Sequence, residues 1–149
     1  MNEGGMTLIV KNTTRLIIGF IAVFGIYIAL TGHLGPGGGF AGGVILAAAA
    51  VLIVLSFGRD SATGWVREPV CHLADAGGAA AFLVVAVLGY LVGGFFVNFI
   101  RPGQPHDPVS GGAIPLSNFA ILIKVGAGLA GAFLALSAFR PGRRDLREP

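Results

Sequence analysis

Four long apolar runs constrain this 149-residue chain more than any other feature. They cover residues 16–30, 40–57, 77–100 and 119–139. A helix of roughly 17 to 25 residues crosses ~30 Å of hydrocarbon, so each run is close to the length of one membrane span. Charged residues make up 11% of the chain, which is too few for an ordinary water-soluble domain. The sequence therefore predicts a membrane protein.

We expect these spans to be helices, because the runs do not alternate with period two and a helix satisfies its own backbone hydrogen bonds in lipid. The prediction is one all-α membrane domain over residues 1–149 with no soluble domain and a basic tail at 140–149. The first run has no A-x-A-like cleavage site after it, so we expect a retained helix. The four predicted helices are 14–31, 40–57, 77–100 and 117–139.

The basic residues predict the orientation of the chain. An even number of spans puts both termini on one side, and only Arg101 falls on the other side. The positive-inside rule then predicts that both termini are cytoplasmic. The basic tail suits lipid headgroups better than nucleic acid. The residues on the terminal side are Lys11, Arg15, Arg59, Arg67, Arg140, Arg143, Arg144 and Arg147.

Small residues recur at helical spacing on three of the predicted helices. Such residues mark packing faces, because they let helix backbones approach closely in lipid. Three such faces are more than four short helices need among themselves, so we expect neighbouring membrane subunits. The faces are Gly39, Gly43, Ala47 and Ala50; Ala86, Gly89 and Gly93; and Lys124, Ala127, Gly128, Gly131 and Ala135.

Lys124 is the one ionisable residue well inside a predicted span. Two interpretations stay open. The lysine stem can extend toward the headgroups. Alternatively, because Lys124 lies on a small-residue face and an intramembrane charge is costly, it points into protein and belongs to an ion path. The second interpretation requires a partner from another helix or subunit.

The histidines offer weaker candidates. His33, at the outer end of the first helix, is either a proton-transfer group or a loop residue bonded to backbone. His72 and Asp75, three residues apart, form either a proton relay or an exposed ion pair on the cytoplasmic side. Neither these groups nor the single Cys71 predicts a metal site or a cofactor.

The stretch "HLGPGGGFAGG" at 33–43 contains a formal G-x-G-x-x-G pattern. A membrane-length helix rather than a strand precedes it, and no Lys-Ser/Thr follows, so neither a dinucleotide nor another nucleotide is expected. Pro36 ends helical continuation, and the glycines allow positive φ angles. The pattern therefore predicts a tight turn that leads into a close-packed helix.

The same stretch resembles the G-H-x-x-P-G-G-G-F signature of the MnhB/MrpB family of small membrane subunits of Mrp-type sodium/proton antiporters. A second stretch, "IPLSNFAILIKVGAGLAG" at 114–131, is similar to the last helix of that family, particularly in the branch found in membrane-bound hydrogenase-like respiratory complexes. Asn118 stands near the place where antiporter members carry an acidic residue. The signature residues are Gly32, His33, Pro36, Gly37, Gly38, Gly39 and Phe40.

The resemblance implies an accessory subunit of a multisubunit cation antiporter or a redox-driven ion pump, in the plasma membrane of a prokaryote. Its expected partners are the other membrane subunits and the lipid bilayer, and the chain is expected to have no enzyme active site of its own. Two alternatives stay open: a purely structural helix-packing subunit that conducts nothing, and a self-assembling channel. Lack of internal repeats and of an intramembrane acid counts against the channel.

Overall fold

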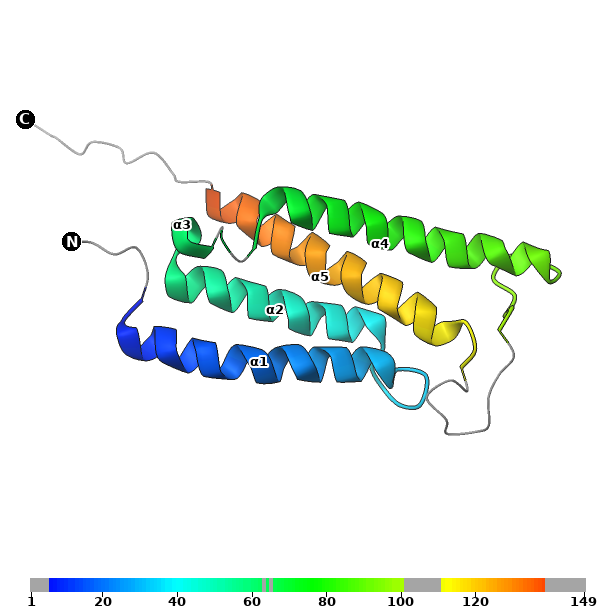
Figure 1. Ribbon diagram of the computed structural model, residues 1–149, viewed down its shortest axis with the longest axis horizontal. Helices are drawn as coiled ribbons and strands as arrows, with labels where there is room; N and C mark the ends of the chain where they lie inside the picture. Colours follow the sequence, from blue (N-terminus) through cyan, green and yellow to red (C-terminus); the bar gives the residue numbers. More distant parts are fainter. Residues whose placement is uncertain (1–5, 63, 65, 101–110, 139–149) are drawn as a thin grey trace, which may run out of the picture.

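The computed structural model describes residues 6–62, 64, 66–100 and 111–138. Within these ranges the chain folds into four long helices, a short helical turn and a single 3-10 turn (Figure 1). All four long helices are long and apolar enough to cross a membrane, which confirms the predicted all-α membrane fold. The elements are α1 (Leu8–Leu30), α2 (Gly39–Phe57), α3 (Arg59–Ala62), α4 (Glu68–Leu88), η1 (Gly89–Leu91) and α5 (Ile114–Ala138).

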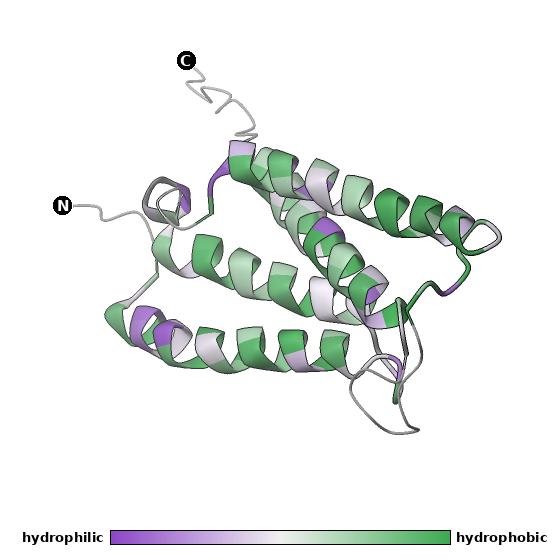
Figure 2. Cartoon of the chain, turned by 45° about the vertical axis from the view of Figure 1, so that its right-hand side comes forward, coloured by the Kyte–Doolittle hydropathy of each residue, from purple (hydrophilic) through white to green (hydrophobic). Residues whose placement is uncertain are grey.

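The helices pack as a row in the order α1, α2, α5, α4 (Figures 1 and 2). The last helix of the sequence, α5, therefore lies between α2 and α4, and α1 adds a small contact with α5. The start of α1 and the end of α5 lie on the same side of the molecule, at the left-hand ends of the helices in Figure 1. Because the row is one helix thick, the described helices leave both of its broad faces uncovered.

Two of the predicted helices differ most from the structure: α1 begins at Leu8 rather than at 14, and the third membrane helix is shifted from its predicted position of 77–100. It begins at Glu68 and ends, with its 3-10 turn, at Leu91. Pro69 favours the early start, because proline fits the first turn of a helix. Gly93, with a φ of 146°, and Phe96, with a φ of 64°, do not continue the helix. A hydropathy pattern misses this shift because the first turns of α4 carry polar residues.

Small side chains fill the contacts between helices. Most buried residues of α2 and α4 are alanine or glycine. Of the predicted α2 face, Gly39, Gly43 and Ala47 are buried, whereas Ala50 is only partly buried. Large apolar side chains point outward instead; Phe20 is 73% exposed and Leu136 74% exposed. Burial within this chain therefore relies on close backbone approach, and the bulk of the hydrophobic surface is left for lipid or other subunits.

Arg59 ties α3 to the ends of the two neighbouring helices. Its guanidinium donates hydrogen bonds to the Leu134 carbonyl at 2.7 Å and to Ser137 Oγ at 3.2 Å, both in α5. It also forms a 3.5 Å ion pair with Glu68 in the first turn of α4. One side chain from the α2–α4 connection thus holds the end of α5 in place.

We expect Arg59→Ala to lower the free energy of unfolding by about 1 to 2 kcal/mol, because a carbonyl and a hydroxyl lose their charged donor. The effect should concentrate in the last turn of α5. Hydrogen–deuterium exchange in detergent should show faster exchange there than in Arg67→Ala, which removes an exposed arginine. Equal exchange in the two variants would contradict this assignment.

Candidate functional site

An ion pair joins α4 and α5 inside their membrane-length segments. Lys124 Nζ lies 3.2 Å from Asp75 Oδ1, and this carboxylate oxygen is buried. Because α5 begins at Ile114, Lys124 lies ten residues along it, or about 15 Å at 1.5 Å per residue. A hydrophilic band is visible within α5, between hydrophobic stretches (Figure 2). The expectation that Lys124 has a partner on another helix is therefore confirmed.

Asp75 corrects one part of the sequence-based interpretation. With a helix starting at 77, the sequence predicts Lys124 as the one ionisable residue well inside a span. The early start of α4 at Glu68 places Asp75 seven residues into that helix, opposite Lys124. The chain therefore carries an intramembrane acid as well as an intramembrane base.

Two glycines make room for this pair, one on each helix. A Cβ on Gly78 would lie 2.7 Å from the Lys124 backbone nitrogen and 2.9 Å from the Ala120 carbonyl oxygen. A Cβ on Gly128 would lie 3.1 Å from Asp75 Oδ1. One turn further along, Gly131 lies against the Cβ of Cys71. Close backbone approach at Gly78 thus brings the two helices together, and Gly128 leaves space for the carboxylate.

The pair is only partly covered by this chain. The Lys124 side chain is 50% exposed and the Asp75 side chain 38% exposed. A single mid-membrane charge costs about 2.5 to 3.5 kcal/mol on insertion scales, and an opposite charge at 3.2 Å offsets part of this cost. An ammonium has three donors, so Lys124 can bind further acceptors while it pairs with Asp75.

We expect Gly78→Ala to separate α4 from α5 at the ion pair and to destabilise the protein by about 2 kcal/mol, because the new methyl group meets backbone atoms that cannot move freely. Gly77→Ala is the matched control, since nothing lies within 4 Å of a Cβ at Gly77. Thermal unfolding of the purified protein in detergent measures both variants. Equal losses would show that Gly78 does not hold this contact.

The glycine signature forms the turn between α1 and α2 and the start of α2. Gly37 and Gly38 have φ angles of 138° and 99°, which side-chain-bearing residues rarely adopt. The Gly38 amide donates to the Ile28 carbonyl at 3.3 Å, so the chain turns back directly onto α1. The predicted tight turn is therefore confirmed. Pro36 and Phe40 lie on its exposed side.

The same signature positions α5. A Cβ on Gly39 would overlap the Asn118 backbone carbonyl, and the Asn118 side chain lies against Gly32 and Gly38. One turn further along α2, Gly43 packs on Val125 and on the Leu122 carbonyl. The signature is thus a contact surface for α5 as well as a turn, and Asn118 packs on it rather than reaching the ion pair.

The two described histidines lie away from the Lys124–Asp75 contact. The His33 ring packs near Gly111, where a Cβ would lie 3.1 Å from it, at the turn before α5. His72 is exposed on α4, one turn before Asp75. Asp75 pairs with Lys124 and not with its neighbour on the same helix. His106 and the basic tail at 140–149 lie outside the described residues.

Sequence patterns missed Gly78, which makes room for the ion pair, and a buried contact between α1 and α2 away from this site. Gly78 stands in a run of alanine and glycine, and only the contact with Lys124 distinguishes it from Gly77. The buried hydrogen bond between Thr14 Oγ1 and Ser56 Oγ, 2.7 Å long, was also not predicted. Both hydroxyls stand inside or beside apolar runs, and this position is the signal that could have found them. No three His, Cys, Asp or Glu residues of the described chain lie close enough to hold a metal ion.

A row of four membrane-length helices with an intramembrane ion pair defines a multi-pass membrane protein. The chain belongs to the MnhB family, since residues 9–131 match the model described as "Domain related to MnhB subunit of Na+/H+ antiporter". This match confirms the resemblance suggested by the glycine signature.

Known proteins similar to this chain in sequence include two relatives. An uncharacterized protein of Methanocaldococcus jannaschii is 36% identical over 141 residues, which cover 90% of this chain and 53% of that protein. A subunit of the Na+/H+ antiporter of Bacillus subtilis is 35% identical over 81 residues, covering 54% of this chain and 53% of that relative. This chain therefore spans about half the length of these two relatives.

A further similarity is structural. A chain in the structure of the membrane-bound sulfane sulfur reductase, an archaeal respiratory membrane complex, superposes with a TM-score of 0.73 at 29% sequence identity. The superposition covers 91% of this chain and 62% of that chain. The helical row is therefore similar to part of a larger membrane subunit.

Proposed function

We propose that this chain is an accessory membrane subunit of a multisubunit cation/proton antiporter or of a redox-driven ion pump with an Mrp-type module. Membership of the MnhB family and the likeness to a chain of a respiratory membrane complex support this proposal. The Asp75–Lys124 pair is the observation that carries the more specific part, a role in the ion pathway. The driving energy comes from a proton gradient or from redox subunits of the parent complex.

The ion pair can act as a reversible electrostatic contact. When a proton or a sodium ion approaches Asp75, it weakens the attraction between the carboxylate and Lys124. The ammonium is then free to turn toward an acceptor on a neighbouring subunit, and it returns when the ion has left. The partial exposure of both side chains, 50% for Lys124 and 38% for Asp75, supports this movement.

The pair also specifies what the neighbouring subunit must offer. A charged pair exposed at mid-membrane depth is better covered by protein than by lipid, because hydrocarbon supplies no hydrogen bonds. We infer a partner helix on this face with an acidic, amide or hydroxyl side chain that accepts from Lys124.

The clustering of basic residues near the start of α1 and the end of α5 supports cytoplasmic termini.

A second candidate function is helix packing alone, with no part in conduction. The row arrangement favours it, because two uncovered broad faces suit a subunit that joins its neighbours. Both functions predict that the complex requires this chain, and they differ in what they expect from charge-neutralising variants of the pair.

Deletion and complementation test the common part of the proposal. Inverted membrane vesicles from a strain that lacks the chain should show no sodium-induced collapse of the proton gradient, as measured with a pH-sensitive dye. Expression of the full chain from a plasmid should restore the response. Full antiport activity in vesicles without the chain would reject the proposed function.

A further inference from the structure

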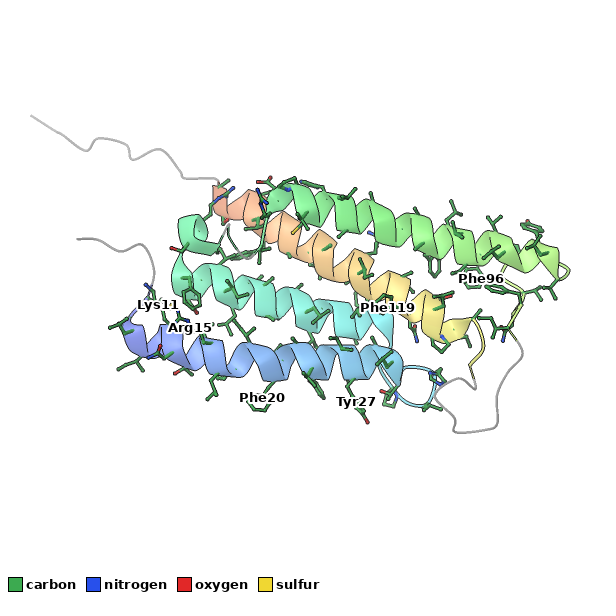
Figure 3. All side chains as sticks on the ribbon, viewed as in Figure 1. Lys11, Arg15, Phe20, Tyr27, Phe96 and Phe119 are labelled. Atoms are coloured by element: carbon green, nitrogen blue, oxygen red, sulfur yellow. The ribbon has the colours of Figure 1, made fainter. Side chains whose placement is uncertain are left out.

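A small groove opens between α1 and α2, near the start of α1 and the end of α2. Arg15, Ile18, Ile53 and Phe57 line a volume of about 150 Å³. At roughly 30 Å³ for each water-sized group, this space holds about five such groups, or a short stretch of an acyl chain. Figure 3 shows Lys11 and Arg15 at this place, where α1 lies beside the end of α2. The groove is thus apolar with a cation at its edge.

The cation is held in place by the surrounding contacts. The Arg15 guanidinium carbon lies 5.3 Å from the centre of the Phe57 ring, within cation–π distance. The neighbouring residues Thr14 and Ser56 form the buried 2.7 Å hydrogen bond that fixes α1 against α2 at this level. Lys11 lies one helical turn before Arg15 and adds a second positive charge to the same end.

The depth of the groove matches the boundary between headgroups and hydrocarbon. Phe57 is the last residue of α2, so the guanidinium stands where that span ends, and Ile18 and Ile53 lie one turn deeper. A ligand that fits must combine an anionic group at the level of Arg15 with an apolar chain below it. An anionic phospholipid has this chemistry, whereas a soluble phosphate lacks the chain and a zwitterionic lipid lacks the net charge.

We propose that the groove formed by Arg15, Ile18, Ile53 and Phe57 binds one anionic phospholipid, with its phosphate on Arg15 and the first part of an acyl chain between α1 and α2. This inference does not depend on the proposed role in ion transport, because the groove lies between α1 and α2, whereas the ion pair joins α4 and α5. The bound lipid would fill the groove and stabilise the contact between the two helices.

The test uses the full chain reconstituted in nanodiscs of phosphatidylcholine mixed with phosphatidylglycerol, then extracted into mild detergent for native mass spectrometry. We expect one phosphatidylglycerol molecule to be retained in preference to phosphatidylcholine. Arg15→Gln should lower this retention about five-fold, the effect of removing one membrane-surface charge. Arg67→Gln, an exposed arginine outside the groove, should retain the lipid as the unchanged chain does.

A second variant separates the acyl-chain contact from the charge. Ile18→Trp fills the groove without altering net charge, so it should also lower phosphatidylglycerol retention. Equal retention of the two lipids by the unchanged chain would overturn the proposal, and so would unchanged retention in both groove variants. Displacement of the lipid by inorganic phosphate alone would assign the site to a free anion and would also overturn it.

Discussion

Gly39→Ala is expected to disrupt the packing of α2 against α5 and to lower the free energy of unfolding by about 3 kcal/mol or more. The added Cβ would overlap the backbone carbonyl of Asn118, and neither backbone can move without shifting a whole helix. Purified protein in detergent should show a lower thermal midpoint and a smaller folded fraction on gel filtration. Loss of this contact would also displace Lys124, which lies on the same helix as Asn118.

A glycine of the same turn that is not part of the signature supplies the control. Gly35 belongs to the same turn, but nothing lies within 4 Å of a Cβ there, and its φ is not in the left-handed region. Gly35→Ala should therefore leave the thermal midpoint almost unchanged. If Gly35→Ala and Gly39→Ala were equally damaging, the signature would require glycine for the turn itself and not for contact with α5.

Lys124→Met is expected to lower sodium-induced proton antiport at least about ten-fold, the effect of about 1.4 kcal/mol on a transport barrier. The substitution removes the ammonium and leaves Asp75 Oδ1 buried without its charged partner. Inverted vesicles measure the transport, and mild-detergent purification of the parent complex measures assembly. The two readouts are needed because an unpaired intramembrane carboxylate also costs about 3 kcal/mol of stability.

The double variant Asp75→Asn with Lys124→Gln separates conduction from packing. It removes both charges and keeps hydrogen-bonding side chains of similar size, so we expect normal assembly. A role in the ion pathway predicts that transport stays low in this assembled complex. Transport at the unchanged rate would leave helix packing as the function of this chain and would reject the pathway.

Several parts of the fold could be predicted because each depends on local sequence. The lengths of the apolar runs give four spans, and the glycines around Pro36 give the turn before α2. The third helix was placed too late, because hydropathy counts Glu68 and Asp75 against a span while helix geometry accepts both. Boundaries follow from caps, proline and backbone angles more than from the hydropathy of a segment.

The candidate site was half predicted for a related reason. Lys124 stands alone in an apolar run, and its cost in lipid requires a partner. Asp75 and His72 are three residues apart, so the sequence suggested that they pair with each other. In the structure Asp75 instead pairs with Lys124, which lies 49 positions later in the chain (124 − 75 = 49), because α5 packs directly against α4.

Local sequence is enough to predict that this chain spans a membrane with four helices, turns tightly at Gly37 and Gly38, and carries a costly lysine within α5. These properties depend on hydropathy, backbone freedom and charge, which belong to short segments. Three other properties emerge only when the helices pack. The helix α5 lies between α2 and α4, Gly78 rather than Gly77 packs against Lys124, and Asp75 is the ion-pair partner of that lysine. They depend on which backbones approach closely in space. Because several helix faces carry small residues, composition alone does not show which of these faces meet.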